Sequence, residues 1–102
     1  MKRDSFYKKC YSILKQVPKG KVATYKEIAK ALKSKAYRAV GNAMKTNPYS
    51  PLVPCHRVIC SDGKVGGYMG SLNNRKKIEL LRKEGVEIIN GKIDTDNFGF
   101  KF

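Results

Sequence analysis

Acidic residues are scarce in this chain of 102 residues, where eight Asp and Glu stand against 22 Lys and Arg and leave a formal net charge of +14. The imbalance is uneven, because residues 1–60 hold 14 basic and two acidic residues whereas residues 61–102 hold eight and six. A charge of this size favours a polyanionic partner, and nucleic acid is the leading candidate. A lysine-rich solubilising surface is the alternative.

Histidine occurs once and cysteine three times, and no Cys/His set has the spacing of a structural zinc site, so we expect no metal. Cys10, Cys55 and Cys60 cannot all pair within one chain, which argues against a disulfide scaffold and for a reducing compartment. The sequence also lacks a run of roughly 18 apolar residues and a signal-peptide pattern, so no membrane partner is expected. We therefore expect one domain over residues 1–102, in the cytoplasm or, in a eukaryote, the nucleus.

Apolar residues three and four positions apart predict a first helix that ends before Pro18 and buries Phe6, Cys10, Ile13, Leu14 and Val17. Thr24 and Glu27 fit a capping box that starts a second helix with Ile28, Ala31 and Leu32 inward. A third helix is expected from a Ser34 cap to about Met44, with Ala36, Val40, Ala43 and Met44 inward.

The third predicted helix has a polar face formed by Arg38, Asn42 and Lys45, at positions i, i+4 and i+7. Two short helices joined by a tight turn, the second with a basic face, resemble a helix-turn-helix, although any small basic helical protein can show this pattern. Ala39 and Gly41 make the same helix slender. Small residues there permit either close approach to another surface or tight helix–helix packing, and the pattern leaves both open.

Three prolines within residues 46–54 exclude regular helix or central strand and predict a stiff loop that leads to Cys55. A strand over residues 57–60 follows, then a turn at Asp62-Gly63. A last helix is expected over residues 71–84 with Ile78 and Leu81 inward. Gly85 stops that helix, Asn90-Gly91 signals another turn, and the tail 94–102 predicts no element.

Cys55 lies beside His56 and Arg57, an electropositive setting that favours a nucleophilic thiolate, although an ordinary semi-buried cysteine is the alternative. Adjacent side chains do not face each other in regular structure, so a direct bond between Cys55 and His56 requires a bent turn, and otherwise a water must relay between them. Glu84 ends a helix, where a carboxylate opposes the helix dipole at a cost of roughly 0.3–1 kcal/mol. This acid is either a functional partner or a solvated residue paired with a nearby lysine.

The motif Pro54-Cys55-His56-Arg57-Val58, preceded by Asn47-Pro48, resembles the active-site signature of the O6-alkylguanine-DNA alkyltransferases, also called methylated-DNA–protein-cysteine methyltransferases. The resemblance covers most of the chain in the same order. It includes Gly20-Lys21-Val22, Tyr25, Arg38-Ala39-Val40-Gly41, Met44, the segment from Gly66 to Tyr68, and Glu84-Gly85.

The resemblance implies that Cys55 accepts the alkyl group, that His56 acts through a water as its base and that Glu84 orients His56. It also implies that Tyr25 donates a hydrogen bond to the departing guanine and that Asn47 braces the turn carrying Cys55. On the DNA side it implies contacts from the helix-turn-helix in the minor groove, with Arg38 entering the base stack; the residues expected there are Arg38, Tyr25, Ala39, Gly41, Asn42 and Lys45. The substrate pocket is expected to be lined by Val58, Tyr68, Met69 and Gly70.

The chain departs from the family at several points. We expect no separate N-terminal domain of the kind that many members carry, and Met69 and Ser71 replace smaller residues or glycine in the pocket segment. Alkyltransferase-like proteins carry tryptophan in place of the acceptor cysteine, whereas this chain has Cys55, which predicts a competent acceptor.

Together these features predict a mostly helical α+β fold, winged helix-turn-helix-like, with four helices and small β-hairpins. The expected partner is double-stranded DNA containing O6-alkylguanine, bound by a monomer. The two alternatives are a non-catalytic lesion-recognising protein and a basic winged-helix regulator.

Overall fold

The helical periodicity near the N-terminus produces α1 (Arg3–Leu14), whose Cys10 and Leu14 side chains are fully buried. The computed structural model of the protein describes residues 3–47, 53–67 and 74–102. Cys10 is a core residue, as predicted, and burial raises the pKa of its thiol to about 11. The helix stops three residues before the predicted end, and hydrogen-bonded turns carry the chain on to the buried Val17.

The capping box predicted for the second helix is present. Thr24 ends the short strand β1 (Ala23–Thr24) and begins α2 (Tyr25–Ala31). Its side chain accepts a hydrogen bond from the Glu27 backbone N–H at 3.1 Å, and the Glu27 carboxylate accepts one from the Thr24 backbone N–H. Two backbone donors at the helix start are thereby satisfied.

The cap predicted for the third helix is wrong. The helix α3 (Tyr37–Lys45) begins after Ala36 and has no side-chain cap, because the Ser34 hydroxyl instead accepts a hydrogen bond from the Ala36 backbone N–H at 3.0 Å. Ala36 is consequently exposed, whereas the sequence placed it inward. The other predicted inward residues of α3, which are Val40, Ala43 and Met44, are buried.

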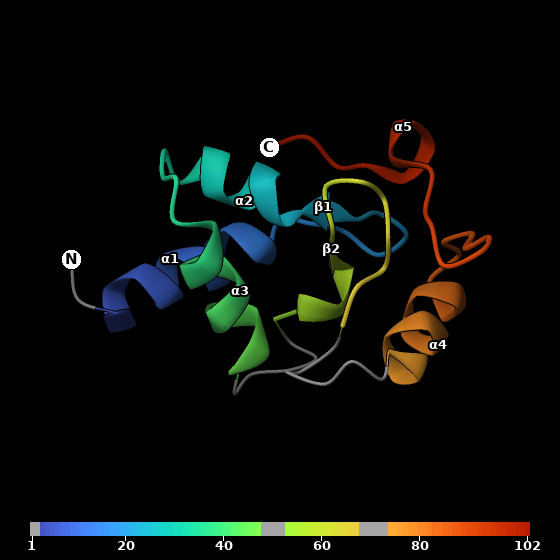
Figure 1. Cartoon of the computed structure of the whole chain (residues 1–102), viewed down its shortest axis with the longest axis horizontal. Coiled ribbons are helices and arrows are strands. Elements are labelled where there is room, and N and C mark those ends of the chain that lie inside the picture. Colours follow the sequence, from blue (N-terminus) through green and yellow to red (C-terminus); the bar gives the residue numbers. More distant parts are fainter. Residues whose placement is uncertain (1–2, 48–52, 68–73) are drawn as a thin grey trace.

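Helices α1, α2 and α3 pack on one another around the larger of two core clusters (Figure 1). The Tyr11 hydroxyl of α1 donates a buried hydrogen bond to the Ala43 carbonyl of α3 at 2.9 Å. This bond ties α1 to α3, the second helix of the helix-turn-helix pair formed by α2 and α3.

The segment after Pro54 forms a short 3-10 turn, η1 (Cys55–Arg57), and then the strand β2 (Val58–Ile59). The strand is shorter than predicted, because Arg57 belongs to the turn. It pairs in parallel with β1 in the register Ala23 to Val58, so the strand before α2 lies beside the strand after Cys55. The turn predicted at Asp62-Gly63 is present, with Gly63 at φ +89°.

The helix α4 (Arg75–Lys83) has Glu84 as its C-cap and stops before Gly85, as predicted. Gly85 at φ +92° and Val86 donate backbone hydrogen bonds to the Arg82 and Leu81 carbonyls, the pattern of a Schellman stop. The predicted start of this helix, from Ser71, lies outside the described residues. Leu81 is buried and Ile78 half-buried.

The C-terminal tail contains an element that the sequence analysis missed. After the Asn90-Gly91 turn, Asp94 accepts a hydrogen bond from the Asp96 backbone N–H and begins α5 (Thr95–Phe98). The described residues therefore contain five α-helices rather than four. Backbone bonds from Val22 to Phe98 and from Phe100 to Val22 join the tail to the segment before β1. The smaller core cluster lies here, between β2, α4 and the tail.

Candidate active site

Cys55 is the first residue of the η1 turn and is 4% exposed. Its backbone N–H donates to the Val53 carbonyl at 2.8 Å, and the Arg57 backbone N–H donates to the Pro54 carbonyl at 2.9 Å. This part of the chain is a tightly bent turn rather than an extended strand. It places Cys55 on the first core cluster with His56 beside it.

Asn47 is 2% exposed and lies just after α3. Its side-chain amide donates a buried hydrogen bond to the Val53 carbonyl at 2.8 Å. Val53 is also the acceptor for the Cys55 backbone N–H. Asn47 thus connects the end of α3 to the turn that carries the cysteine.

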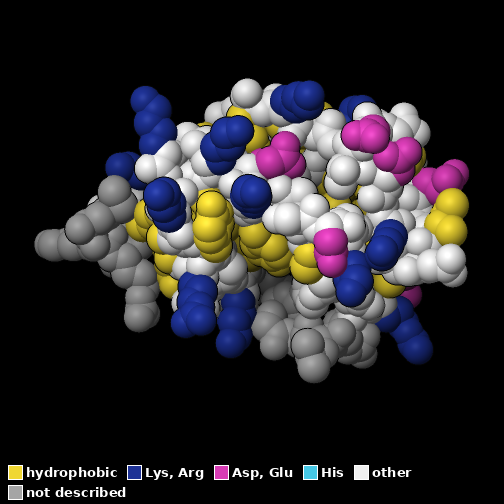
Figure 2. Space-filling view, turned by 45° about the horizontal axis from the view of Figure 1, so that its top comes forward, with side chains coloured by type: hydrophobic (Ala, Val, Ile, Leu, Met, Phe, Trp, Pro, Cys, Tyr) yellow, Lys and Arg dark blue, Asp and Glu magenta, His cyan; other side chains and the backbone are white. Residues whose placement is uncertain are grey.

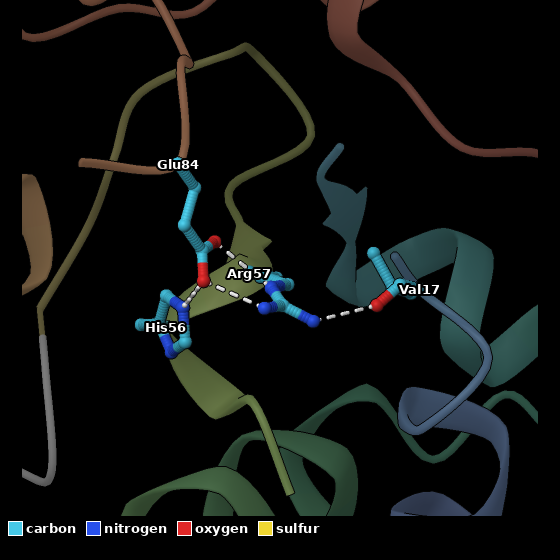
Figure 3. Close-up of polar contacts among 4 residues, drawn as sticks. All are labelled: Val17, His56, Arg57 and Glu84. Atoms are coloured by element: carbon cyan, nitrogen blue, oxygen red, sulfur yellow. Dashed lines mark hydrogen bonds and ion pairs between the residues drawn. The ribbon is translucent and has the colours of Figure 1, made fainter. Parts of the chain in front are cut away.

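His56, Arg57 and Glu84 meet where η1 faces the end of α4 (Figure 3). The Glu84 Oε2 atom lies 3.1 Å from His56 Nε2. Arg57 donates from Nε to Glu84 Oε1 at 2.9 Å and from Nη2 to Glu84 Oε2 at 2.6 Å. A two-pronged guanidinium–carboxylate pair of this kind fixes the orientation of the acid.

Burial acts to raise the pKa of Glu84, but the hydrogen bonds and charges of Arg57 and His56 outweigh it and hold that pKa below its ordinary value. Burial lowers the pKa of His56, and the hydrogen bond with Glu84 opposes the change only in part. At neutral pH the pair is therefore a carboxylate and a neutral imidazole. Because Nε2 faces the carboxylate, Nε2 carries the proton and Nδ1 is the basic nitrogen.

The basic nitrogen of His56, Nδ1, is buried and has no hydrogen-bond partner among the described residues. Buried polar atoms of this kind ordinarily bind an ordered water or a ligand. The imidazole therefore presents a proton acceptor within the site, while its opposite nitrogen is held by Glu84.

The sequence analysis used Arg57 only as a positive charge beside Cys55, and the contacts of its side chain were not predicted. Besides binding Glu84, it donates from Nη1 to the Val17 carbonyl at 2.9 Å (Figure 3). Val17 lies 40 positions earlier in the chain, after α1. No local sequence signal predicts such a contact, which depends on how the chain after α1 lies against the η1 turn.

Tyr25 reaches the site through the parallel pairing of β1 with β2, which sets Thr24 opposite Ile59. Burial raises the pKa of Tyr25 to about 12, and the charges of the Cys60 and Cys55 thiolates act in the same direction. The phenol is therefore protonated at neutral pH, and its hydroxyl is available as a hydrogen-bond donor.

Lys77 of α4 is a second residue that sequence reasoning missed. It is 1% exposed, although a lysine in a helix rich in basic residues is expected to be solvated. Its ammonium group donates to the Gly67 carbonyl at 3.1 Å. Burial lowers the pKa of Lys77 to about 8, and the Cys60 and Cys55 thiolates act in the opposite direction.

Apart from Tyr25, which begins α2, the residues expected to contact DNA lie on α3. Arg38, Asn42 and Lys45 are exposed, and Ala39 and Gly41 are half-buried. A Cβ added at Gly41 would have no described heavy atom within 4 Å, so packing within the described chain does not require a glycine there. Of the two explanations left open, close approach to another surface is therefore favoured.

The basic side chains and the acidic side chains are unequally distributed on the surface. On the face drawn in Figure 2, the half of the molecule formed by α1 to α3 displays Lys and Arg, whereas most acidic side chains lie toward the half with α4 and α5. This distribution matches the charge asymmetry of the sequence and leaves the helix-turn-helix half electropositive.

The predicted pocket residues are only partly described. Val58 is fully buried in β2, and its backbone N–H bonds the Cys55 carbonyl. Tyr68, Met69 and Gly70 lie outside the described residues. Within the described part, no three His, Cys, Asp or Glu side chains form a group that could hold a metal ion. No helix in that part has both the length and the apolar character needed to cross a membrane.

Comparisons with known proteins agree on one family. The family model of the 6-O-methylguanine DNA methyltransferase DNA-binding domain matches residues 5–86. A bifunctional methyltransferase/endonuclease of Picrophilus torridus is 44% identical over 101 residues, which is 98% of this chain and 33% of that protein. A methylated-DNA–protein-cysteine methyltransferase of Methanosarcina barkeri is 49% identical over 79% of this chain and 52% of its own length. The chain thus spans about a third to a half of these relatives.

Two solved structures illustrate the likeness of the fold. S. pombe Atl1, in complex with damaged DNA containing O6-carboxymethylguanine, matches over 100% of both chains with a TM-score of 0.89 and 35% identity. The O6-methylguanine-DNA methyltransferase of Pyrococcus kodakaraensis KOD1 matches over 79% of this chain and 46% of that one, with a TM-score of 0.70 and 50% identity. By its sequence and its fold, the chain belongs to the family of the 6-O-methylguanine DNA methyltransferase DNA-binding domain.

Proposed function

We propose that the protein repairs alkylated DNA by transferring the alkyl group of O6-alkylguanine to Cys55, once and irreversibly. The observation that carries the proposal is the assembly of a cysteine, a neutral histidine and a helix-end carboxylate at one turn, with a free basic nitrogen on His56. The relatives named as methyltransferases act on methylated DNA by their names, which gives the substrate class.

In the proposed reaction, a water bridges Cys55 to the basic Nδ1 of His56 and carries the thiol proton to it. The thiolate attacks the alkyl carbon, so that a carbon–sulfur bond forms and the bond from that carbon to O6 breaks. The guanine leaves as an anion and takes a proton donated by Tyr25, which is protonated at neutral pH. The proton on His56 returns to the phenolate through solvent, so the net products are guanine and an uncharged thioether.

Access to the lesion requires the base to leave the duplex, because O6 lies inside the base stack. Flipping costs a few kcal/mol, and we propose that Arg38 of α3 occupies the vacated position and offsets part of that cost. Ala39, Gly41, Asn42 and Lys45 would form the rest of the DNA face. The reaction needs no cofactor, and we propose that a monomer, with its site and DNA face both within residues 1–102, performs it in the cytoplasm or nucleus.

The test is to incubate the protein with a duplex bearing one O6-methylguanine and to measure its intact mass, followed by peptide mapping. One methyl group per molecule on Cys55 is expected. The Cys55→Ser variant should gain none yet still bind DNA, and Cys60→Ser is the matched control that should still be methylated. An unmodified wild-type protein that binds the lesion would overturn the proposal.

A second candidate is lesion recognition without transfer. The likeness to Atl1, whose structure contains damaged DNA, favours lesion recognition, because Atl1 matches the whole chain. The methyltransferase structure matches only 79% of it. The same mass measurement separates the two functions. Strong preference for one undamaged sequence would instead indicate a regulator, since repair proteins bind undamaged duplex almost indifferently.

A further inference from the structure

Tyr37 is an exposed aromatic residue that the proposed transfer does not use. It is the first residue of α3, directly before Arg38, and it is 48% exposed. Its side chain makes no hydrogen bond or ring contact with another described residue. The two other large hydrophobic residues that are exposed in the described part of the chain, Ile89 and Phe102, lie in its C-terminal half. On the helix expected to meet DNA, one aromatic ring is therefore available to an external partner.

The surroundings of Tyr37 favour a polyanionic partner. A lone exposed hydrophobic residue is ordinary on a protein surface, so it indicates a site only through its neighbours. Here the neighbours are cations, because Lys33, Lys35 and Arg38 are all exposed and residues 28–61 contain no acidic residue. A cationic surface that includes an aromatic ring is the pattern by which proteins hold nucleic acid and stack on its bases.

The position of Tyr37 on α3 places its ring beside the Arg38 side chain. Consecutive residues of a helix point about 100° apart, so the two side chains do not lie on opposite faces. Gly41 follows Tyr37 by four positions and shares its side of the helix. A Cβ added at Gly41 would meet no described heavy atom within 4 Å, so nothing described covers this side of α3. The ring therefore borders the slender part of the helix, where close approach to a duplex is favoured.

We propose that Tyr37 is a second DNA-contacting residue at the lesion: its ring stacks on a base left exposed when the alkylated nucleotide leaves the duplex, next to the position that Arg38 fills. The inference rests on the proposed function, because it assigns a residue to the base flipping that transfer requires. Flipping removes a stacking partner from the bases on either side of the nucleotide, and stacking on an aromatic ring recovers part of what is lost.

The first test uses the absence of tryptophan from the sequence. Tyr37→Trp, made together with Cys55→Ser so that no alkyl group is transferred, gives the protein one tryptophan whose fluorescence reports stacking. Its emission should be quenched on titration with a duplex bearing one O6-methylguanine, and much less with the undamaged duplex. Ile89→Trp in the same background is the matched control at another exposed position, and its emission should not change.

The second test measures binding by fluorescence anisotropy with a labelled duplex that carries the lesion. Tyr37→Ala should weaken binding about tenfold, whereas Tyr37→Phe keeps the ring and should bind as the wild type does. Alanine is the better helix former, so the variant should remain folded. The dependence of the dissociation constant on salt should not change in Tyr37→Ala, because the ring carries no charge and releases no counterion. A weaker salt dependence would overturn the proposal, since the loss would then lie in phosphate contacts.

Absence of quenching in Tyr37→Trp, or equal quenching by the damaged and undamaged duplexes, would also overturn the proposal. So would self-association without DNA that Tyr37→Ala abolishes in analytical ultracentrifugation, because the ring would then be covered by a second copy of the chain. Quenching by the damaged duplex, together with a wild-type protein that gains no methyl group, would refute transfer to Cys55 alone.

Discussion

Gly41 offers a test in which stability and DNA binding should change in opposite directions. It is the fifth of nine residues in α3, and its φ lies outside the left-handed region that favours glycine. Alanine is favoured over glycine in a helix interior by about 0.8–1.0 kcal/mol. Because an added Cβ meets no described atom within 4 Å, no steric cost subtracts from this gain. We expect Gly41→Ala to raise the melting temperature by about 4–8 °C.

The same methyl group should weaken DNA binding, because α3 would no longer approach the duplex as closely. A tenfold loss corresponds to about 1.4 kcal/mol and is the expected size. Thermal unfolding followed by circular dichroism measures the first effect, and fluorescence anisotropy with a labelled duplex measures the second. Gly41→Ser should weaken binding similarly while stabilising less. Stabilisation with unchanged binding would refute the assignment of α3 as the contact surface, and destabilisation would show that packing requires the glycine.

Three further predictions concern the site. Glu84→Gln should lower the free energy of unfolding, measured with urea, by about 1.5–3 kcal/mol, since it weakens charged hydrogen bonds to Arg57 and His56. Because the pKa of Glu84 is lower in the folded protein than in the unfolded chain, its carboxylate stabilises the fold at pH values above the ordinary pKa, and this stabilisation is lost as pH falls through the folded pKa. The Glu84→Gln variant should therefore lose less stability on acidification than the wild type. Equal acid sensitivity of the two proteins would refute this. Tyr25→Phe should slow transfer about a hundredfold in single-turnover assays, and an unchanged rate would exclude a proton donor there. Arg38→Ala should impair transfer from duplex more than from the free modified base, whereas equal losses would remove the case for base flipping.

The fold was predictable from sequence where its signals are local. The capping box at Thr24, the stop at Gly85 and the turn at Asn90-Gly91 each depend on residues within a few positions, and all three are present. The parallel pairing of β1 with β2 was not predicted, because two-residue strands carry no usable period and their partners lie 35 positions apart, at Ala23 and Val58. The short α5 was missed because four residues are too few for helical periodicity to appear.

The residues of the candidate site were also predictable only where their sequence signals are local. Cys55 and His56 were found because they are adjacent, and Glu84 because a carboxylate at a helix end contradicts the helix dipole. Lys77 was given no role, and Arg57 only that of a positive charge beside Cys55, since a basic residue in a basic chain looks solvated whatever its environment. Their contacts, to the Val17 and Gly67 carbonyls, exist only once distant segments have packed.

Hydrogen bonds from Arg57 explain why the Glu84 carboxylate is stable at the C-terminal end of α4. A carboxylate in the last turn of a helix costs roughly 0.3–1 kcal/mol, whereas each hydrogen bond to a charged group contributes about 1.5–3 kcal/mol. Two such bonds from Arg57 exceed the cost before His56 is counted. The arginine therefore keeps the acid ionised and in place, so that its remaining hydrogen-bonding capacity can hold the imidazole. The orientation of the His56 ring then depends on an ion pair in which Arg57 also binds the chain after α1.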